Sequence, residues 1–165
     1  MRYRRSLIEG ATYFFTVALA NRRSDLLVRH IDHLHAVTRS VQQRHPFDIV
    51  AAVVLPDHLH VIWTLPDGDA NYPLRWALIK SAFSRAIPKT ETIAKNRLAR
   101  RERAIWQRRY WEHQIRDDTD LQTHVDYVHY NPVKHGHMLR AEDWHYSSIH
   151  RFMREGLVKR GWGVE

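Results

Sequence analysis

The chain has 165 residues, 44% of them hydrophobic, which suits one globular domain with its own core. It contains no cysteine, so disulfides, zinc knuckles and cysteine nucleophiles are excluded, and any metal ion needs His, Asp, Glu, Asn or Gln as ligands. The formal net charge of +8 favours a polyanionic partner. No apolar run predicts a membrane span, and no signal-type cleavage site follows the basic start, so a cytoplasmic protein is expected.

The first half of the chain alternates strand and helix patterns. Aromatic, β-branched and helically spaced apolar residues predict, in chain order, a strand over 12–19, a helix over 26–44, strands over 47–55 and 58–65, and a helix over about 76–87. The run over 47–55 is almost continuously apolar, which predicts a central strand buried on both faces. Pro56 and Asp57 allow only a tight connection after it, so the two neighbouring strands should form a hairpin.

A basic block follows, in which residues 85–109 hold nine Lys or Arg side chains against two Glu. Such a block attracts a polyanion through phosphate neutralisation and counterion release, although a solvated charged loop has the same composition. The segment 89–104 within the block is expected to be a loop or a short charged helix. The sequence does not decide whether this segment binds a polyanion or is only a solvated charged loop.

The remaining residues predict a strand or strand pair over 105–116, a helix over 119–130 and a tail over 136–165 with a short docked helix. Thr119 and Gln122 fit a capping box at the start of the predicted helix. Pro132 should end that helix near Asn131, because a proline disfavours helical geometry in the residue before it.

The element order β-α-β-β-α-β-α matches the ferredoxin-like split βαβ pattern. The predicted class is therefore α+β: a ferredoxin-like antiparallel sheet with helices packed on it, plus a C-terminal helical tail. Neither a repeat nor a linker divides the chain, so residues 1–165 are expected to form one domain with a core over about 4–135.

Two histidines flank one leucine in the strand segment LPDHLHVIWTL, residues 55–65. Residues two apart in a strand share a face, so His58 and His60 lie on one side while Leu59, Val61 and Trp63 face a core. Both imidazoles can reach one metal ion, and two protein ligands leave positions open, as a catalytic metal requires. A chain with 13 histidines also yields this pattern by chance, so a metal site needs a third ligand.

The segment HVDYVHYNPVKHG, residues 124–136, offers the missing groups. Tyr127 and Asn131 are four residues apart and lie one above the other on a helix, beside an apolar stripe of Leu121, Val125 and Val128. Tyr127 offers a phenolic nucleophile, and Asn131 offers a carbonyl oxygen to a hard metal ion. A packing tyrosine gives the same local pattern, so the combination with the two histidines is what indicates chemistry.

This combination resembles a known family. The segments FTVALANRRSDLL, LPDHLHVIW, IWQRRYWEHQIRD and YVHYNPVKHG stand in the right order and are similar to the HUH single-tyrosine transposases, in particular to their REP-associated branch. The resemblance implies a ferredoxin-like core, a Mg²⁺ or Mn²⁺ ion bound by His58, His60 and Asn131, and Tyr127 as the nucleophile. Asn131 departs from related insertion-sequence transposases, which have Gln at that position.

The resemblance also implies a reaction and a substrate. The activity would be metal-dependent cleavage and strand transfer of single-stranded DNA through a 5′-phosphotyrosine intermediate. The partner would be a REP-type hairpin with a short tetranucleotide at its foot, and the protein would act as a monomer or a homodimer. The side chains expected to contact DNA are Arg4, Arg5, Arg22, Arg23, Lys80, Arg108, Arg109 and Arg116. Candidates for base stacking or for core packing are Tyr3, Trp76, Trp106, Tyr110 and Trp111.

Two other functions fit the same residues. A ferredoxin-like sheet with aromatic side chains and a charge of +8 also suits a non-catalytic module that binds single-stranded DNA or RNA. A metal-dependent phosphodiesterase that activates water would cut DNA without a tyrosyl intermediate. Formation of a covalent protein–DNA adduct separates both of these functions from the transposase reaction.

Overall fold

The computed structural model of the chain describes residues 5–89 and 104–164. Its elements, in chain order, are β1 (Thr12–Ala18), α1 (Leu26–Arg29), α2 (Ile31–Arg44), β2 (Asp48–Val54), β3 (His58–Thr64), α3 (Tyr72–Ala86), β4 (Trp111–Gln114), α5 (Asp118–Lys134), the 3₁₀ turn η1 (Ala141–Asp143) and α6 (Ile149–Arg154). No helix in these ranges is long and apolar enough to cross a membrane. Tyr3, Arg4 and most of the basic segment 89–104 lie outside the described residues.

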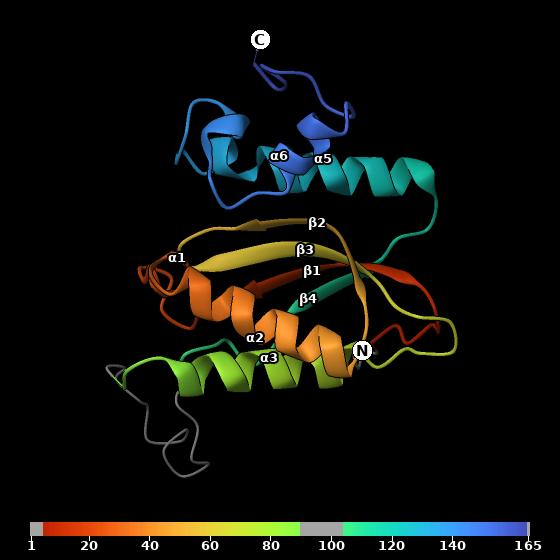
Figure 1. Cartoon of the computed structure of the whole chain (residues 1–165), viewed down its shortest axis with the longest axis vertical. Coiled ribbons are helices and arrows are strands. Elements are labelled where there is room, and N and C mark those ends of the chain that lie inside the picture. Colours follow the sequence, from red (N-terminus) through yellow and green to blue (C-terminus); the bar gives the residue numbers. More distant parts are fainter. Residues whose placement is uncertain (1–4, 90–103, 165) are drawn as a thin grey trace, which may run out of the picture.

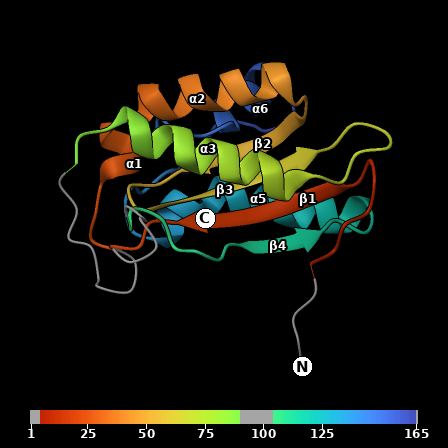
Figure 2. The same cartoon turned by 90° about the horizontal axis from the view of Figure 1, so that it is seen from below.

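The four strands form one antiparallel sheet in the order β2-β3-β1-β4. This order and the helices packed on the sheet confirm the predicted ferredoxin-like α+β class, and α6 confirms the helix expected in the tail. The predicted hairpin is also confirmed, since β2 and β3 pair directly and the backbone N–H of Leu55 donates to the oxygen of His58 over 2.8 Å. Seen from below, β4 lies at the edge of the sheet farthest from α2 (Figure 2).

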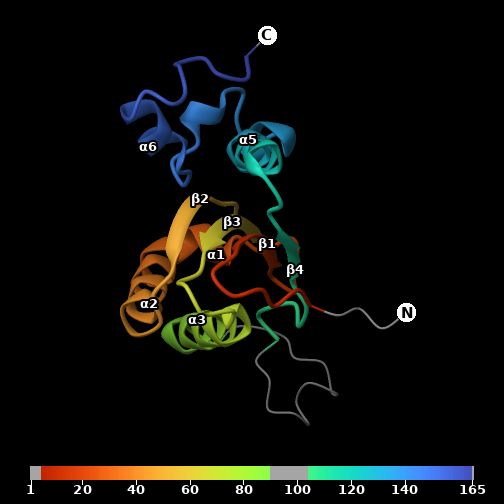
Figure 3. The same ribbon diagram turned by 90° about the vertical axis from the view of Figure 1, so that its right-hand side faces the viewer.

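Helices cover both faces of the sheet. α2 and α3 lie on one face, whereas α5 and α6 lie on the other (Figures 1 and 3). The core under α2 and α3 takes alternate residues of β1 and β3, which include Tyr13, Phe15, Val17, Leu59, Val61 and Trp63. The core under α5 takes the intervening residues Phe14 and Ile62, which pack with Val125 and Val128 of α5. The even-numbered face of β3 is therefore the face that α5 covers.

Two tryptophans and a buried arginine join α3 to the sheet. Trp63 of β3 stacks on Trp76 of α3, with ring centroids 4.2 Å apart. Arg75 is 1% exposed, and its Nη2 lies 2.8 Å from a carboxylate oxygen of Asp69. The same guanidinium donates to two backbone carbonyl oxygens just after α2. Because a buried charge is costly without partners, this set of bonds holds the loop before β2 against the loop before α3.

The predicted central position of the strand over 47–55 was wrong, because β2 is an edge strand. The C-terminal segment covers that edge: the backbone N–H of Val54 donates to the oxygen of Tyr146 over 2.9 Å. Ala52 donates to Ser148 Oγ over 2.9 Å, and the indole N–H of Trp144 donates to the Val54 oxygen over 2.9 Å. An edge strand covered in this way is apolar on both faces, like a central strand, so the sequence pattern alone could not tell the two apart.

Two predictions about α5 were also wrong. The N-cap is Asp117, whose carboxylate accepts from the backbone N–H of Asp120 over 2.7 Å, so Thr119 and Gln122 form no capping box. Pro132 does not end the helix, which continues to Lys134. A proline in the last turn removes one backbone donor only, and the helix is long enough to tolerate that loss.

The helices of the first half differ from the prediction at their ends. The predicted helix over 26–44 is divided at His30 into α1 and α2. The helix expected from about residue 76 begins at Tyr72, because the Asn71 side chain accepts from the Leu74 N–H over 3.2 Å and Pro73 suits a first turn. The region 105–116, where a strand or strand pair is expected, contains the strand β4 and, before it, one isolated bridge between Trp106 and Leu19.

The contact between β2 and the C-terminal segment leads to a stability prediction. Ser148 Oγ contacts the backbone N–H of Ala52 and, over 2.8 Å, Nε2 of His129. Ser148→Ala removes the partner of the buried His129 ring and of the N–H of the half-buried Ala52, so the free energy of unfolding should fall by about 1–3 kcal/mol. Ser40→Ala, at an exposed position of α2, is the matched control. Equal urea midpoints for the two variants would contradict this role of Ser148.

Candidate metal and tyrosine site

The two histidines of β3 lie on the face that α5 covers. His58 is 4% exposed and His60 is 3% exposed, and their ring centroids are 4.9 Å apart. Both rings are therefore close enough to contribute ligands to a single ion. The register of the sheet places them opposite Ala18 and Thr16 of β1, in the regular part of the ladder.

Each histidine has a partner that orients its ring. Nδ1 of His58 lies 2.9 Å from a carboxylate oxygen of Asp57, which can only accept, so this nitrogen carries the proton. Nδ1 of His60 lies 2.8 Å from the hydroxyl of Thr16. A ring held through Nδ1 in this way presents Nε2 to the site, which is the usual arrangement of a metal-binding histidine.

Burial keeps both rings neutral. Desolvation lowers the pKa of His58 below its usual value, although Asp57 acts in the opposite direction. Desolvation, with a contribution from the charge of His58, lowers the pKa of His60 to about 3. A neutral imidazole has a free lone pair, so both side chains are in the protonation state that binds a metal ion.

Asn131 faces the two rings from α5. It is fully buried, and its amide is close enough to influence the pKa of both His58 and His60. Within the described residues, neither Oδ1 of Asn131 nor Nε2 of His60 has a hydrogen-bond partner, although both atoms are buried. Buried polar atoms normally have partners, and these two are an oxygen and a nitrogen of the kind that a divalent cation binds. The donor set therefore fits a divalent ion.

Tyr127 lies one helical turn before Asn131, at the open side of this cluster. Its side chain is 36% exposed, and its ring packs edge-on against His60, with centroids 5.2 Å apart, and against Phe14, at 5.8 Å. The ammonium group of Lys134 lies 3.4 Å from its hydroxyl and 4.7 Å from its ring centroid. The phenol is thus held beside the histidine pair while its oxygen stays open to a large substrate.

The acidic and basic groups around the histidines are paired with each other. Arg22 Nε lies 2.5 Å from a carboxylate oxygen of Asp57. Burial opposes ionisation of Asp57, but the hydrogen bonds from Arg22 and His58 outweigh it, so the pKa of this carboxyl lies below its usual value. His135, just after α5, completes the rim, with its ring 5.1 Å from that of His58. Asp57 therefore stays charged at neutral pH and can orient His58.

Sequence reasoning missed four of these neighbours: Asp57, Thr16, Lys134 and His135. Asp57 was interpreted as a turn residue, although a carboxylate directly before a metal-binding histidine is also a common orienting group. Thr16 and His135 come next to the histidines only through strand pairing and through the end of α5, so no local pattern identifies them.

Some predicted DNA-contacting residues have partners within the protein. Arg5 lies over the Tyr110 ring, 4.0 Å from its centroid, and 3.7 Å from the carboxylate of the buried Glu112. Lys80 donates to the backbone oxygen of Gln107 over 2.9 Å. These contacts give Arg5 and Lys80 a structural role near β4 and α3.

Other predicted DNA-contacting residues are open to solvent. The Arg22 side chain is 52% exposed despite its ion pair, and it adjoins the histidine pair. Of the other residues predicted to contact DNA, the exposed ones are Arg23, Arg108, Arg109 and Arg116. The structure thus brings Arg22 to the candidate site and leaves the other four on the surface.

The aromatic side chains considered for base stacking also divide into buried and exposed ones. Trp76 and Trp106 are 3% and 7% exposed and belong to the core under α3. Tyr110 packs against that core beneath Arg5. Trp111 is 58% exposed, which leaves it able to stack on a base.

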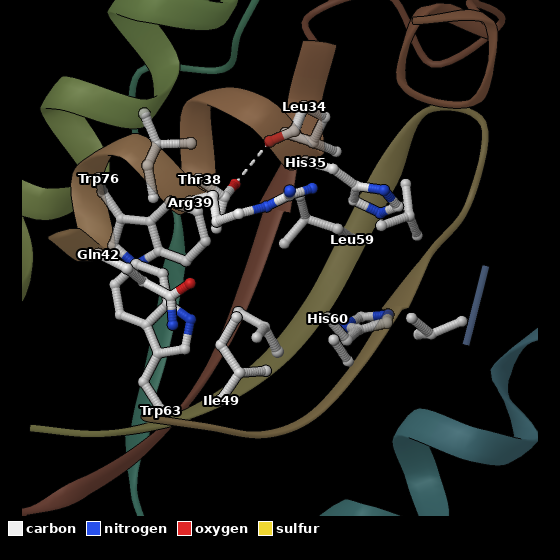
Figure 4. Close-up of a pocket in the computed structure, with 15 residues that line it drawn as sticks. Leu34, His35, Thr38, Arg39, Gln42, Ile49, Leu59, His60, Trp63 and Trp76 are labelled. Carbon is white, nitrogen blue, oxygen red and sulfur yellow. Dashed lines mark hydrogen bonds between the residues drawn. The ribbon is translucent and has the colours of Figure 1, made fainter. Parts of the chain in front are cut away.

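A hollow lies between α2 and strands β2 and β3, and His60 is among the residues that line it (Figure 4). Its volume is about 260 Å³, and its lining is mainly apolar, with Trp63 and Trp76 at one end. Polar side chains of α2, including Arg39 and Gln42, also line it. Neither Tyr127 nor any carboxylate lines this hollow, so phosphoryl chemistry is better supported at the cluster under α5.

Comparisons with known proteins agree with this geometry. Residues 8–131, which contain His58, His60, Tyr127 and Asn131, match the family described as "Transposase IS200 like". The REP-associated tyrosine transposase of Escherichia coli K12 is 45% identical over 160 residues, which cover 97% of this chain and 89% of that protein. A Haemophilus influenzae protein named for the same transposase group is 44% identical over 162 residues, 98% of this chain and 92% of its own.

A solved structure extends the likeness to three dimensions. It is that of a REP-associated tyrosine transposase bound to a REP hairpin, with a TM-score of 0.86 and 42% identity. The match covers 100% of this chain and 92% of the solved one. The chain therefore belongs to the IS200-like transposase family, as its sequence indicates, and within it to the REP-associated tyrosine transposases.

Proposed function

We propose that the protein is a metal-dependent endonuclease and strand transferase that acts on single-stranded DNA at hairpin repeats. The observation that carries this proposal is the meeting of three groups: two neutral histidines, a buried amide oxygen without a partner, and an accessible tyrosine hydroxyl. In this proposal residues 1–165 act as one HUH domain, as a monomer or a homodimer.

The metal ligands would be His58, His60 and Asn131, and the ion would be Mg²⁺ or Mn²⁺. Bound there, the ion would polarise the scissile phosphate and offset the negative charge that develops during attack. Asp57 holds the proton of His58 on Nδ1 over 2.9 Å, and the hydroxyl of Thr16 orients the ring of His60 over 2.8 Å. The surrounding apolar face of the sheet shields the ligands from bulk water.

Tyr127 would be the nucleophile. Its oxygen attacks phosphorus and loses its proton, the bond from phosphorus to the 3′ oxygen breaks, and that oxygen leaves as a 3′-hydroxyl after taking up a proton. The 5′ end stays on the protein as a phosphotyrosine, and attack by a 3′-hydroxyl reverses the reaction. The ester keeps the bond energy, so no ATP is needed. Lys134, 3.4 Å from the hydroxyl, holds the phenol in place with a positive charge beside the attacking oxygen.

The exposed cations around the site suit a DNA backbone. Arg22 adjoins His58, and Lys134 lies beside Tyr127, so a phosphate that approaches the site meets positive charge. The likeness to a transposase solved with a REP hairpin supports a hairpin of this kind as the partner. We propose in addition that a short tetranucleotide at the foot of the hairpin is recognised. We propose that Arg23, Arg108, Arg109 and Arg116 contact the hairpin away from the site.

The first prediction concerns the nucleophile. With Mn²⁺ and a single-stranded hairpin oligonucleotide, the wild type should form a covalent adduct that survives denaturing electrophoresis. Tyr127→Phe should form no adduct and cleave at least ~10³-fold more slowly, because the attacking oxygen is absent. Tyr130→Phe, an exposed tyrosine on the same helix, is the matched control and should retain activity.

The outcomes of this assay also distinguish the alternatives. Cleavage at the wild-type rate by Tyr127→Phe would favour a phosphodiesterase that activates water. Hairpin binding by the wild type without cleavage or adduct would favour a non-catalytic module.

The second prediction concerns the orientation of His58. Asp57→Asn keeps the size of the side chain but removes the charge that fixes the Nδ1 proton, so the Kd for Mn²⁺ should rise about 10–100-fold. Asp48→Asn, at an exposed position of β2, is the matched control. Isothermal titration of both variants with Mn²⁺ gives the comparison. Equal affinities would show that Asp57 does not orient the ligand.

A further inference from the structure

We propose that His113, Asp120 and His124 form a second metal site, specific for a transition-metal ion such as Zn²⁺, that joins β4 to the first turns of α5. One ligand atom from each of these side chains lies within 4.8 Å of the other two. The site shares no residue with the cluster of His58, His60 and Asn131, and it does not depend on the proposed reaction.

The three side chains are arranged around one carboxylate. Nε2 of His113 lies 2.8 Å from Oδ2 of Asp120. Nδ1 of His124 lies 2.8 Å from the backbone oxygen of Asp120 and 3.1 Å from Oδ1 of its carboxylate. The two imidazole rings are stacked, with centroids 4.5 Å apart and planes at 16°. Imidazole nitrogen atoms from β4 and from α5 thus meet at a single carboxylate, which also accepts from the backbone N–H of Arg116 over 2.9 Å.

The ligand set favours a particular class of metal. Two imidazoles and one carboxylate suit Zn²⁺, Co²⁺ or Ni²⁺, whereas Mg²⁺ prefers oxygen ligands and retains its waters. Each ring would ligate through the nitrogen that now contacts Asp120 and would carry its proton on the other nitrogen. On binding an ion, Nδ1 of His124 would give up its hydrogen bond to the backbone oxygen of Asp120.

The position of the cluster allows an ion to enter from solvent. The exposed fractions of the side chains are 22% for both histidines and 16% for Asp120, so the ligands are sheltered but reachable. Three protein ligands leave at least one coordination position for water, as in other open zinc sites.

The cluster adjoins the candidate tyrosine site through one aromatic ring. The centroid of the Phe14 ring lies 4.9 Å from that of His124 and 5.6 Å from that of His60. Phe14 of β1 is also the residue directly opposite His113 of β4 in the sheet. His124 also precedes Tyr127 by one helical turn. An ion bound by His113 and His124 would therefore fix the part of α5 that carries Tyr127 against the edge strand β4.

The test uses the full chain without a histidine tag, with His58→Ala and His60→Ala introduced to remove the other candidate site. This background protein should bind one Zn²⁺ per chain in isothermal titration, and Co²⁺ should give the visible absorption of a nitrogen- and oxygen-coordinated ion. Adding His124→Gln or Asp120→Asn should raise the Kd at least about tenfold. His33→Gln is the matched control, because His33 is an exposed histidine whose ring lies 5.9 Å from that of His30.

Thermal unfolding gives a second measurement. Zn²⁺ should raise the Tm of the background protein and of its His33→Gln variant, and it should raise the Tm of the His124→Gln variant by clearly less. The proposal is overturned if the background protein binds no Zn²⁺, or if one Zn²⁺ binds with equal affinity in the His124→Gln variant. Neither result bears on the adduct assay with Tyr127, so the two proposals fail separately.

Discussion

The apposition of β3 and α5 is the constraint on which the rest of the structure depends. Alternation along β3 gives one face to the core under α2 and α3, and the same alternation gives His58 and His60 to the opposite face. α5 covers that face, anchored by Val125 and Val128, and brings the fully buried Asn131 against both rings. No single element holds the donor set, so the site exists only when this layer is packed.

That packing carries a cost that a bound ion would offset. A buried polar atom without a partner costs about 1–3 kcal/mol, and two such atoms, on His60 and Asn131, face the same region. The C-terminal segment contributes to holding them there, since Trp144 packs in the same core as α5 and bonds to the edge of β2. Stability is thus partly given up at the place where the proposed reaction would require free ligand atoms.

Much of the fold follows from periodicity. A period of two in β3 predicts which face carries the histidines, and the proline-containing connection predicts the hairpin. The position of β2 at the edge could not be predicted, because the residues that cover it come from Trp144 to Ser148, about ninety residues later in the chain. The end of α5 was missed because local helix rules give Pro132 more weight than it has in a last turn.

Local sequence patterns also predict only part of the candidate site. Sequence spacing identifies His58, His60, Tyr127 and Asn131, which the structure brings together, but the placement of Asn131 depends on the helix continuing through Pro132. Charge alone does not separate structural from functional arginines. The half-buried Arg5 packs on Tyr110 while the exposed Arg22 adjoins the histidines, and both are equally basic in the sequence.

The most direct test of the central claim is electron paramagnetic resonance of Mn²⁺ bound to protein labelled with ¹⁵N-histidine. The ion should show hyperfine coupling to two histidine nitrogens, one of which disappears in His58→Ala and the other in His60→Ala. Asn131→Ala should weaken Mn²⁺ binding while leaving both couplings in the fraction that still binds. Mn²⁺ bound to the wild type without any coupling to a histidine nitrogen would contradict the account.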